Sequence, residues 1–166
     1  MTTPSATMRC RLEAQGYVGL SDEVMAEVGP WARLATGLCM TWVVVGTVLG
    51  SATMIWALMP IAALGAILPW HPFDLIYNHG IRHLLGKRPL PRHRAPRRFA
   101  CSIATVWLAA AGYAFYSGAT ALGYILGGSL AVAAAFPTFT DFCIPSYFYG
   151  LMFGKVAPTP AEPKTT

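Results

Sequence analysis

Two long stretches without a charged residue limit what this chain can fold into. No Asp, Glu, Lys or Arg lies between Arg33 and Asp74, or between Arg98 and Asp141. Each stretch holds about 40 residues, whereas one membrane-spanning helix needs about 20 apolar residues. Only 11% of the residues are charged, and soluble domains usually carry about a quarter. We therefore expect an all-α integral membrane protein with two spans in each stretch.

Short runs of small residues divide each stretch. Residues 50–53 read GSAT and residues 117–118 read SG, which are typical turn sequences. The predicted fold is a bundle of four transmembrane helices in two hairpins, and the alternative is one long helix through either stretch. The predicted spans are residues 33–49, 53–69, 99–116 and 119–136.

The distribution of basic residues predicts the orientation in the membrane. All twelve Lys and Arg lie before the first span, in the central loop 71–98, or after the last span at Lys155 and Lys164. By the positive-inside rule, these segments and both termini are cytoplasmic. The predicted parts are a cytoplasmic segment 1–31 with a short helix, a transmembrane domain 32–156 and a Pro-rich tail 157–166.

The central loop carries a dense basic run, KRPLPRHRAPRR, at residues 87–98. Anionic lipid headgroups explain this run, at about 1 kcal/mol per basic residue near the surface, and we expect no nucleic-acid partner. The residues predicted to contact headgroups or a protein partner are Arg82, Lys87, Arg88, Arg92, Arg94, Arg97 and Arg98.

Two helices are expected outside the spans. Ser21, followed by two acidic residues, is a plausible cap for a helix that ends at Gly29 and Pro30. Residues 73–85 predict an amphipathic helix in the headgroup plane. Its apolar face would carry Phe73, Ile76, Tyr77, Ile81 and Leu84, and its polar face Asp74, Asn78 and Arg82.

Glycines at helical spacing predict close helix contacts in the membrane. Small residues four apart let two backbones approach. The alternatives are packing within the bundle and docking onto a partner subunit. The predicted contact residues are Gly46, Gly50, Gly123, Gly127 and Gly128.

Candidate chemistry is sparse. His79 and His83 are one helical turn apart, with His71 and Asp74 nearby, but a tetrahedral metal site needs further convergent ligands, so headgroup contact is the preferred interpretation. No histidine falls inside a predicted span, so no cofactor held by an intramembrane imidazole is expected. We predict no metal, no cofactor and no catalytic residue.

The four cysteines are widely separated and form no C-x-x-C pattern. Cys10 lies near the N-terminus, while Cys39 and Cys101 are each interpreted as small apolar fillers in a span. No disulfide framework is predicted.

The segment that follows the last span is the most unusual. Asp141 is the acid nearest the membrane core, and such a group is either functional or paired with an arginine of the central loop, Arg97 or Arg98. Cys143 and Ser146 follow it. Placed near a helix C-terminus and close to Asp141, Cys143 is not expected to be a catalytic thiol.

Two motifs carry a resemblance. The run PRRFA at residues 96–100, and DFCIPSY at residues 141–147, resemble a family of small bacterial four-helix membrane proteins described as a domain of unknown function. The similarity covers roughly residues 31–153 and implies the bacterial inner membrane. The family closes its fourth helix with F-C-x-G-C. Ser146 replaces the second cysteine here, which removes the dithiol implied by the family motif.

Two functions remain in view. The first is a non-enzymatic subunit that packs against other subunits of a larger inner-membrane complex, with photosynthetic and respiratory complexes as the commonest hosts. The alternative is a thiol-dependent membrane protein that exchanges with a thioredoxin-like partner through Cys143. A transporter is a more distant reading, since only Asp141 would serve a substrate path.

Overall fold

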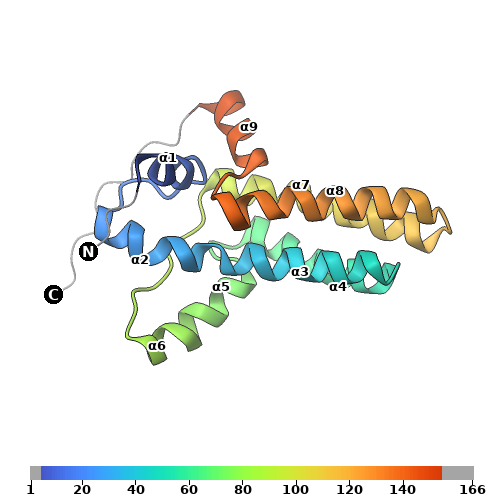
Figure 1. Ribbon diagram of the computed structural model, residues 1–166, viewed down its shortest axis with the longest axis horizontal. Helices are drawn as coiled ribbons and strands as arrows, with labels where there is room; N and C mark the ends of the chain where they lie inside the picture. The colour runs from blue at the N-terminus through green and yellow to red at the C-terminus, as the bar shows by residue number, and fades with distance from the viewer. Residues whose placement is uncertain (1–4, 155–166) are drawn as a thin grey trace.

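Four long helices lie alongside one another in the computed structural model, which describes residues 5–154 (Figure 1). No strand occurs within that range. The helix α4 packs on α7, and α3 packs on α8. Their shared core contains Val43, Ile55, Leu58, Leu108 and Leu130. The bounds of the four helices are α3 (Leu34–Val48), α4 (Ala52–Ile67), α7 (Ala95–Tyr116) and α8 (Thr120–Thr140).

Tight turns divide both charge-free stretches, so a single long helix through either one is ruled out. Gly50 has φ +59°, and Ser51 caps α4 by accepting a hydrogen bond from the Met54 N–H at 3.3 Å. Gly118, with φ +81°, occupies the second turn. Both turns lie at the same end of the bundle (Figure 1).

Among the described residues, three segments are long and apolar enough to cross a membrane: Asp22–Val48, Ala95–Tyr116 and Thr120–Thr140. The count becomes four if Ala52–Ile67 and Pro72–Leu85, which meet at an angle of 81°, form one broken span. The chain is therefore an all-α protein with the helices of a membrane protein.

The first of these segments corrects the prediction that a helix ends at Gly29 and Pro30. Ser21 caps α2 (Asp22–Ala32) as predicted, but α2 runs through Pro30, and α3 begins two residues after α2 ends. A proline removes one backbone hydrogen bond, and the apolar contacts of this stretch outweigh that loss. The continuation places Arg33 at the junction of the two helices.

The segment predicted as an amphipathic helix forms a helical arm, and the face that it buries differs from the predicted one. It consists of α5 (Pro72–Ile76), the π-helix η1 (Tyr77–Ile81) and α6 (Arg82–Leu85). Asp74 and Asn78, predicted on the exposed polar face, are both buried, whereas Ile76 and Leu84 are exposed. The wider turn of a π-helix shifts the register, and the sharp bend after α4 turns this face toward the protein.

A second core forms where α1 (Ala6–Ala14), α2 and the arm meet. Leu12, Met25, Val28 and Tyr77 are buried in it. Together with α9 (Ile144–Phe153), these elements lie at the end of the bundle opposite the two turns (Figure 1). We call this the basic end, because the arginines of α1, the α2–α3 junction, the arm and the start of α7 lie there. The Pro-rich tail 157–166, Lys155 and Lys164 lie outside the described residues.

The predicted contact glycines lie in different surroundings. A Cβ added to Gly46 would lie 3.0 Å from Ile55 Cδ1, and one added to Gly123 would lie 2.6 Å from Phe115 Cδ1. At Gly127 the added atom would overlap the Thr47 side chain, while at Gly128 nothing lies within 4 Å. Gly46, Gly123 and Gly127 therefore face neighbouring helices of the chain, and Gly128 faces outward.

Candidate functional site: a thiol-lined cavity at the basic end

Three of the four cysteines line one cavity of about 150 Å³. Cys39 comes from α3, Cys101 from α7 and Cys143 from the connection between α8 and α9. His71 and Arg97 line the same cavity, and most of the remaining wall is apolar. The three thiols line one cavity because α3, α7 and the connection after α8 meet at the basic end of the bundle.

His71 lies beside two of these thiols. Its Nδ1 accepts a hydrogen bond from the Phe73 N–H at 3.3 Å, which caps α5 and leaves the ring proton on Nε2 in the neutral form. Nε2 lies 3.8 Å from Cys39 Sγ, so the ring donates toward the sulfur. A Cβ added to Gly65 would lie 3.2 Å from Cys101 Sγ and 2.5 Å from His71 Cδ2. The His71 ring and the Cys101 thiol therefore meet at this glycine.

Burial controls the protonation of His71. It lowers the pKa of His71 to about 4, against the opposing effect of the Asp74 carboxylate. The ring is neutral at pH 7, and it acts toward Cys39 as a hydrogen-bond donor. A positively charged imidazole is not part of this site at neutral pH.

This pKa predicts acid sensitivity. Because the folded pKa of His71 lies below the unfolded value of 6.5, its contribution to stability is complete above pH 6.5 and is lost as the pH falls toward 4. The loss amounts to up to about 3 kcal/mol. The melting temperature in detergent, measured from pH 7.5 to 4, should fall less steeply for His71→Asn, which retains a capping group. An unchanged slope would contradict this assignment.

Arg97 is the positive charge of the site. Its guanidinium is buried, donates to the Tyr17 hydroxyl and donates to the Ala32 carbonyl at 2.9 Å. It also interacts electrostatically with Cys101 and Cys143. Burial raises the pKa of Tyr17 to about 12, so the phenol stays protonated and accepts from the arginine. Arg97 is therefore fixed inside the protein and is not available to lipid headgroups, unlike the exposed arginines of the central loop.

A buried histidine and a buried aspartate contact each other near His71. His93 Nε2 lies 2.7 Å from Asp74 Oδ2, and both side chains are almost completely buried. Burial, followed by the charge of Arg97, lowers the pKa of His93, and Asp74 opposes this effect. Asp74 Oδ1 and His93 Nδ1 have no hydrogen-bond partner among the described residues. The pair faces His71, whose ring centroid lies 6.5 Å from that of His93.

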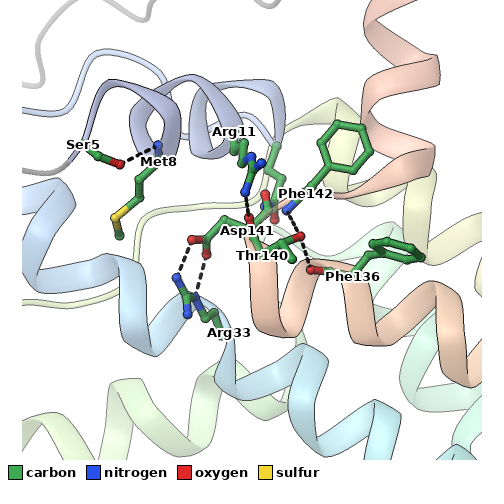
Figure 2. Close-up of polar contacts among 9 residues, drawn as sticks. Ser5, Met8, Arg11, Arg33, Phe136, Thr140, Asp141 and Phe142 are labelled. Atoms are coloured by element: carbon green, nitrogen blue, oxygen red, sulfur yellow. Dashed lines mark hydrogen bonds and ion pairs between the residues drawn. The ribbon is translucent and has the colours of Figure 1, made fainter.

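Asp141 has a different partner from the one predicted. Its carboxylate is bound by Arg33, whose Nε donates to Oδ1 at 2.6 Å, and not by Arg97 or Arg98 (Figure 2). Arg98 donates instead to the Ala66 carbonyl at 2.8 Å. The prediction of an arginine partner is confirmed, but the residue was wrong because the continuous α2–α3 path brings Arg33 to this point.

The end of α8 is held by the N-terminal helix. Arg11 donates to the Thr140 carbonyl at 2.7 Å (Figure 2). Gln15 donates to the Asp141 carbonyl at 2.6 Å. Asp141 adopts a left-handed conformation, with φ 58°. These bonds satisfy carbonyls that a helix end leaves open, and they fix the segment that carries Cys143.

Cys143 lies near the C-terminus of α8, as predicted, but it also lies at the start of a further helix that the sequence analysis did not predict. It is the N-cap residue of α9, three residues beyond the end of α8. Ser146 is buried, and its hydroxyl donates to the Pro96 carbonyl at 3.2 Å. Ser146 therefore ties α9 to the start of α7.

The histidines that were considered and rejected as metal ligands do not converge. His79 and His83 are exposed on the arm, away from the cavity. Within residues 5–154, no group of three or more His, Cys, Asp or Glu residues is arranged to hold a metal ion. Among the functional candidates, sequence reasoning missed Cys39, Cys101 and His71. Their common signal is position along the bundle, because Cys39 and Cys101 lie near the basic ends of α3 and α7, and His71 immediately precedes α5.

The fold and the apolar helices define the class, a helical membrane protein. Residues 30–153 match the family described as Domain of unknown function (DUF4395), and the chain belongs to this family. The resemblance stated from the sequence is thereby confirmed as a match to a family of unknown function. No curated protein and no solved structure matches the chain.

Proposed function

We propose that this chain is a thiol-dependent membrane protein that exchanges with a thioredoxin-like partner at the basic end of its bundle. The observation that carries the proposal is the convergence of Cys39, Cys101 and Cys143 on one cavity. Three of four cysteines meeting beside a buried arginine and a histidine is more than apolar filling requires. In this proposal Cys101 supplies the second thiol of the exchange, because Ser146 stands where the family motif would have a cysteine.

In this proposal, four spans cross the membrane and the basic end is cytoplasmic. Exposed apolar side chains on the outer surfaces of α7 and α8, among them Val106, Ile125 and Val132, support contact with lipid. The cytoplasm keeps thiols reduced, which suits a cavity of free cysteines. A soluble thioredoxin-like partner reaches this end without crossing the bilayer.

The exchange proceeds in two balanced steps. The Cys143 thiolate attacks one sulfur of the partner's disulfide, and the released partner thiolate takes up a proton. Cys101 then displaces the partner from the mixed disulfide, so that a Cys101–Cys143 disulfide forms and the partner leaves as a dithiol. Two electrons pass from this chain to the partner, and the reverse reaction returns them. Arg97 supplies the positive charge in the cavity that both cysteines line.

Trapping the mixed disulfide tests the proposal. The purified full chain in detergent is mixed with oxidised thioredoxin and analysed by non-reducing electrophoresis. Cys101→Ser should accumulate a covalent complex through Cys143, because the second step is blocked. Cys143→Ser should form no complex, and Cys10→Ser, which changes an exposed thiol outside the cavity, should behave as the wild type. Complex formation that persists in Cys143→Ser would refute the proposed order.

A second candidate function is the non-enzymatic subunit of a larger inner-membrane complex. The surface of α9 favours it, since Phe148, Leu151, Met152 and Phe153 are all more than half exposed. An apolar helix surface of this kind is typical of a contact with another subunit or with lipid. If this candidate is right, Cys143→Ser leaves co-purification with other proteins unchanged. Leu151→Glu then releases the chain from the proteins that co-purify with it in mild detergent.

A further inference from the structure

A large basic groove lies beside the thiol cavity at the same end of the bundle. Its volume is about 1030 Å³, and it is bounded by residues 16–20, the arm and residues 88–94. The floor contains Tyr17, Asn78 and Leu90, which are buried. The Asn78 Oδ1 accepts a hydrogen bond from the Leu90 N–H at 2.8 Å, so the arm and the loop that form the groove are joined.

The lining of the groove is strongly positive. Four arginines contribute to it, Arg82, Arg88, Arg92 and Arg94, and no Asp or Glu is among the described lining residues. The nearest acid to Arg88 is Glu27, at 3.7 Å from its Nε and outside the lining. Guanidinium groups gathered around one space favour an anion with several oxygens, because each presents paired N–H donors.

Trp70 adds an independent indication of a ligand. Its indole Nε1 is buried and has no hydrogen-bond partner among the described residues. The guanidinium of Arg92 lies over the same ring, 5.2 Å from the centroid. A buried N–H without an acceptor costs free energy, and an anionic oxygen in the groove would accept from it.

The walls also contain apolar residues, which limits the class of anion. Val18, Leu20, Val24 and Leu75 line the groove next to the arginines. On the adjacent arm, Ile76 is 52% and Leu84 88% exposed, as expected for side chains that enter the lipid boundary. A ligand that matches both the arginines and the apolar walls has a phosphate group and an apolar tail.

We infer that this groove binds the phosphate of an anionic phospholipid, with the headgroup against the arginines and Trp70. The inference does not depend on the thiol chemistry proposed above. It also differs from a general attraction of basic residues to the membrane surface, because it assigns the affinity to particular residues. Lys87 makes this difference measurable, since it is exposed in the same loop and does not line the groove.

Calorimetry on the full chain in neutral detergent tests the inference, with dioctanoyl phosphatidylglycerol as the probe. The wild type should bind one equivalent, and phosphatidylcholine should bind at least tenfold more weakly, an order-of-magnitude expectation for an arginine-lined site. Arg92→Gln should weaken phosphatidylglycerol binding about tenfold, whereas Lys87→Gln should change it by less than about twofold. Trp70→Phe keeps the ring, removes the N–H donor and should weaken binding by about threefold.

Inorganic phosphate forms a further arm of the experiment and distinguishes the source of the anion. Phosphate alone should bind much more weakly than the lipid, and equal affinities would assign the same groove to a soluble phosphate compound. Equal losses for Arg92→Gln and Lys87→Gln would overturn the site, because they would indicate surface charge alone. Equal binding of phosphatidylcholine and phosphatidylglycerol would also overturn it.

Discussion

Gly127→Leu should destabilise the bundle by more than about 3 kcal/mol, because the new side chain has no space between α8 and α3. Even a single Cβ at this position would overlap Thr47 Oγ1 and Cγ2. Thr47 is itself buried against α8, so its side chain cannot move aside toward lipid. The expected result is a large fall in the thermal midpoint of the purified protein in detergent.

The neighbouring residue supplies a matched control. Gly128 belongs to the same helix, but nothing lies within 4 Å of an added Cβ. Gly128→Leu should therefore leave the midpoint almost unchanged. A pair of smaller substitutions tests whether the overlap with Thr47 is the cause. The fall in thermal midpoint caused by Gly127→Ala should be partly reversed when Thr47→Ala is added. Equal effects of leucine at positions 127 and 128 would show that α8 does not pack on α3 in this register.

Arg97→Leu should cost about 3 to 5 kcal/mol, the range for breaking a buried polar network on one side. The guanidinium joins the start of α7 to the end of α2 through Ala32 and to the 15–20 segment through Tyr17. Its loss leaves the Tyr17 hydroxyl and the Ala32 carbonyl without these bonds. It also removes the nearest positive charge from the buried pair of Asp74 and His93.

Two further variants separate the charge from the hydrogen bonds. Tyr17→Phe removes one bond and should cost about 1 kcal/mol. Arg97→Lys keeps the charge but cannot reach both acceptors in the same geometry, so its cost should lie between those of the other two variants. Denaturant titration of the detergent-solubilised protein gives the three values. An Arg97→Leu protein as stable as the wild type would mean that Arg97 is exposed.

Much of the fold follows from the distribution of charge. The absence of charged residues between Arg33 and Asp74 predicts two helices there, and the small residues around Gly50 predict the turn between them. Both features depend on local sequence alone. Ser21 also caps α2 as its neighbours predict. Where local preference and tertiary packing agree, the sequence is a sufficient guide.

The site was harder to predict because its residues meet only after helices pair. Cys39, Cys101 and Cys143 are separated by long apolar helices, and their spacing in the chain gives no sign of contact. The sequence pattern places Asp74 on an exposed polar face, but Asp74 is buried. The 81° bend after α4 turns this face of the arm toward the protein. Local periodicity identifies a helix, but it does not say which face meets the protein after a bend.

The contacts of α1 have a consequence for where this domain begins. The family match starts at residue 30, and so it leaves out the helix whose Arg11 and Gln15 hold the carbonyls at the end of α8. It also leaves out Tyr17, the partner of Arg97. A chain cut at residue 30 would keep every long helix and still lose the clamp on the segment that carries Cys143. The segment that matches the family is therefore shorter than the unit that folds around this cavity.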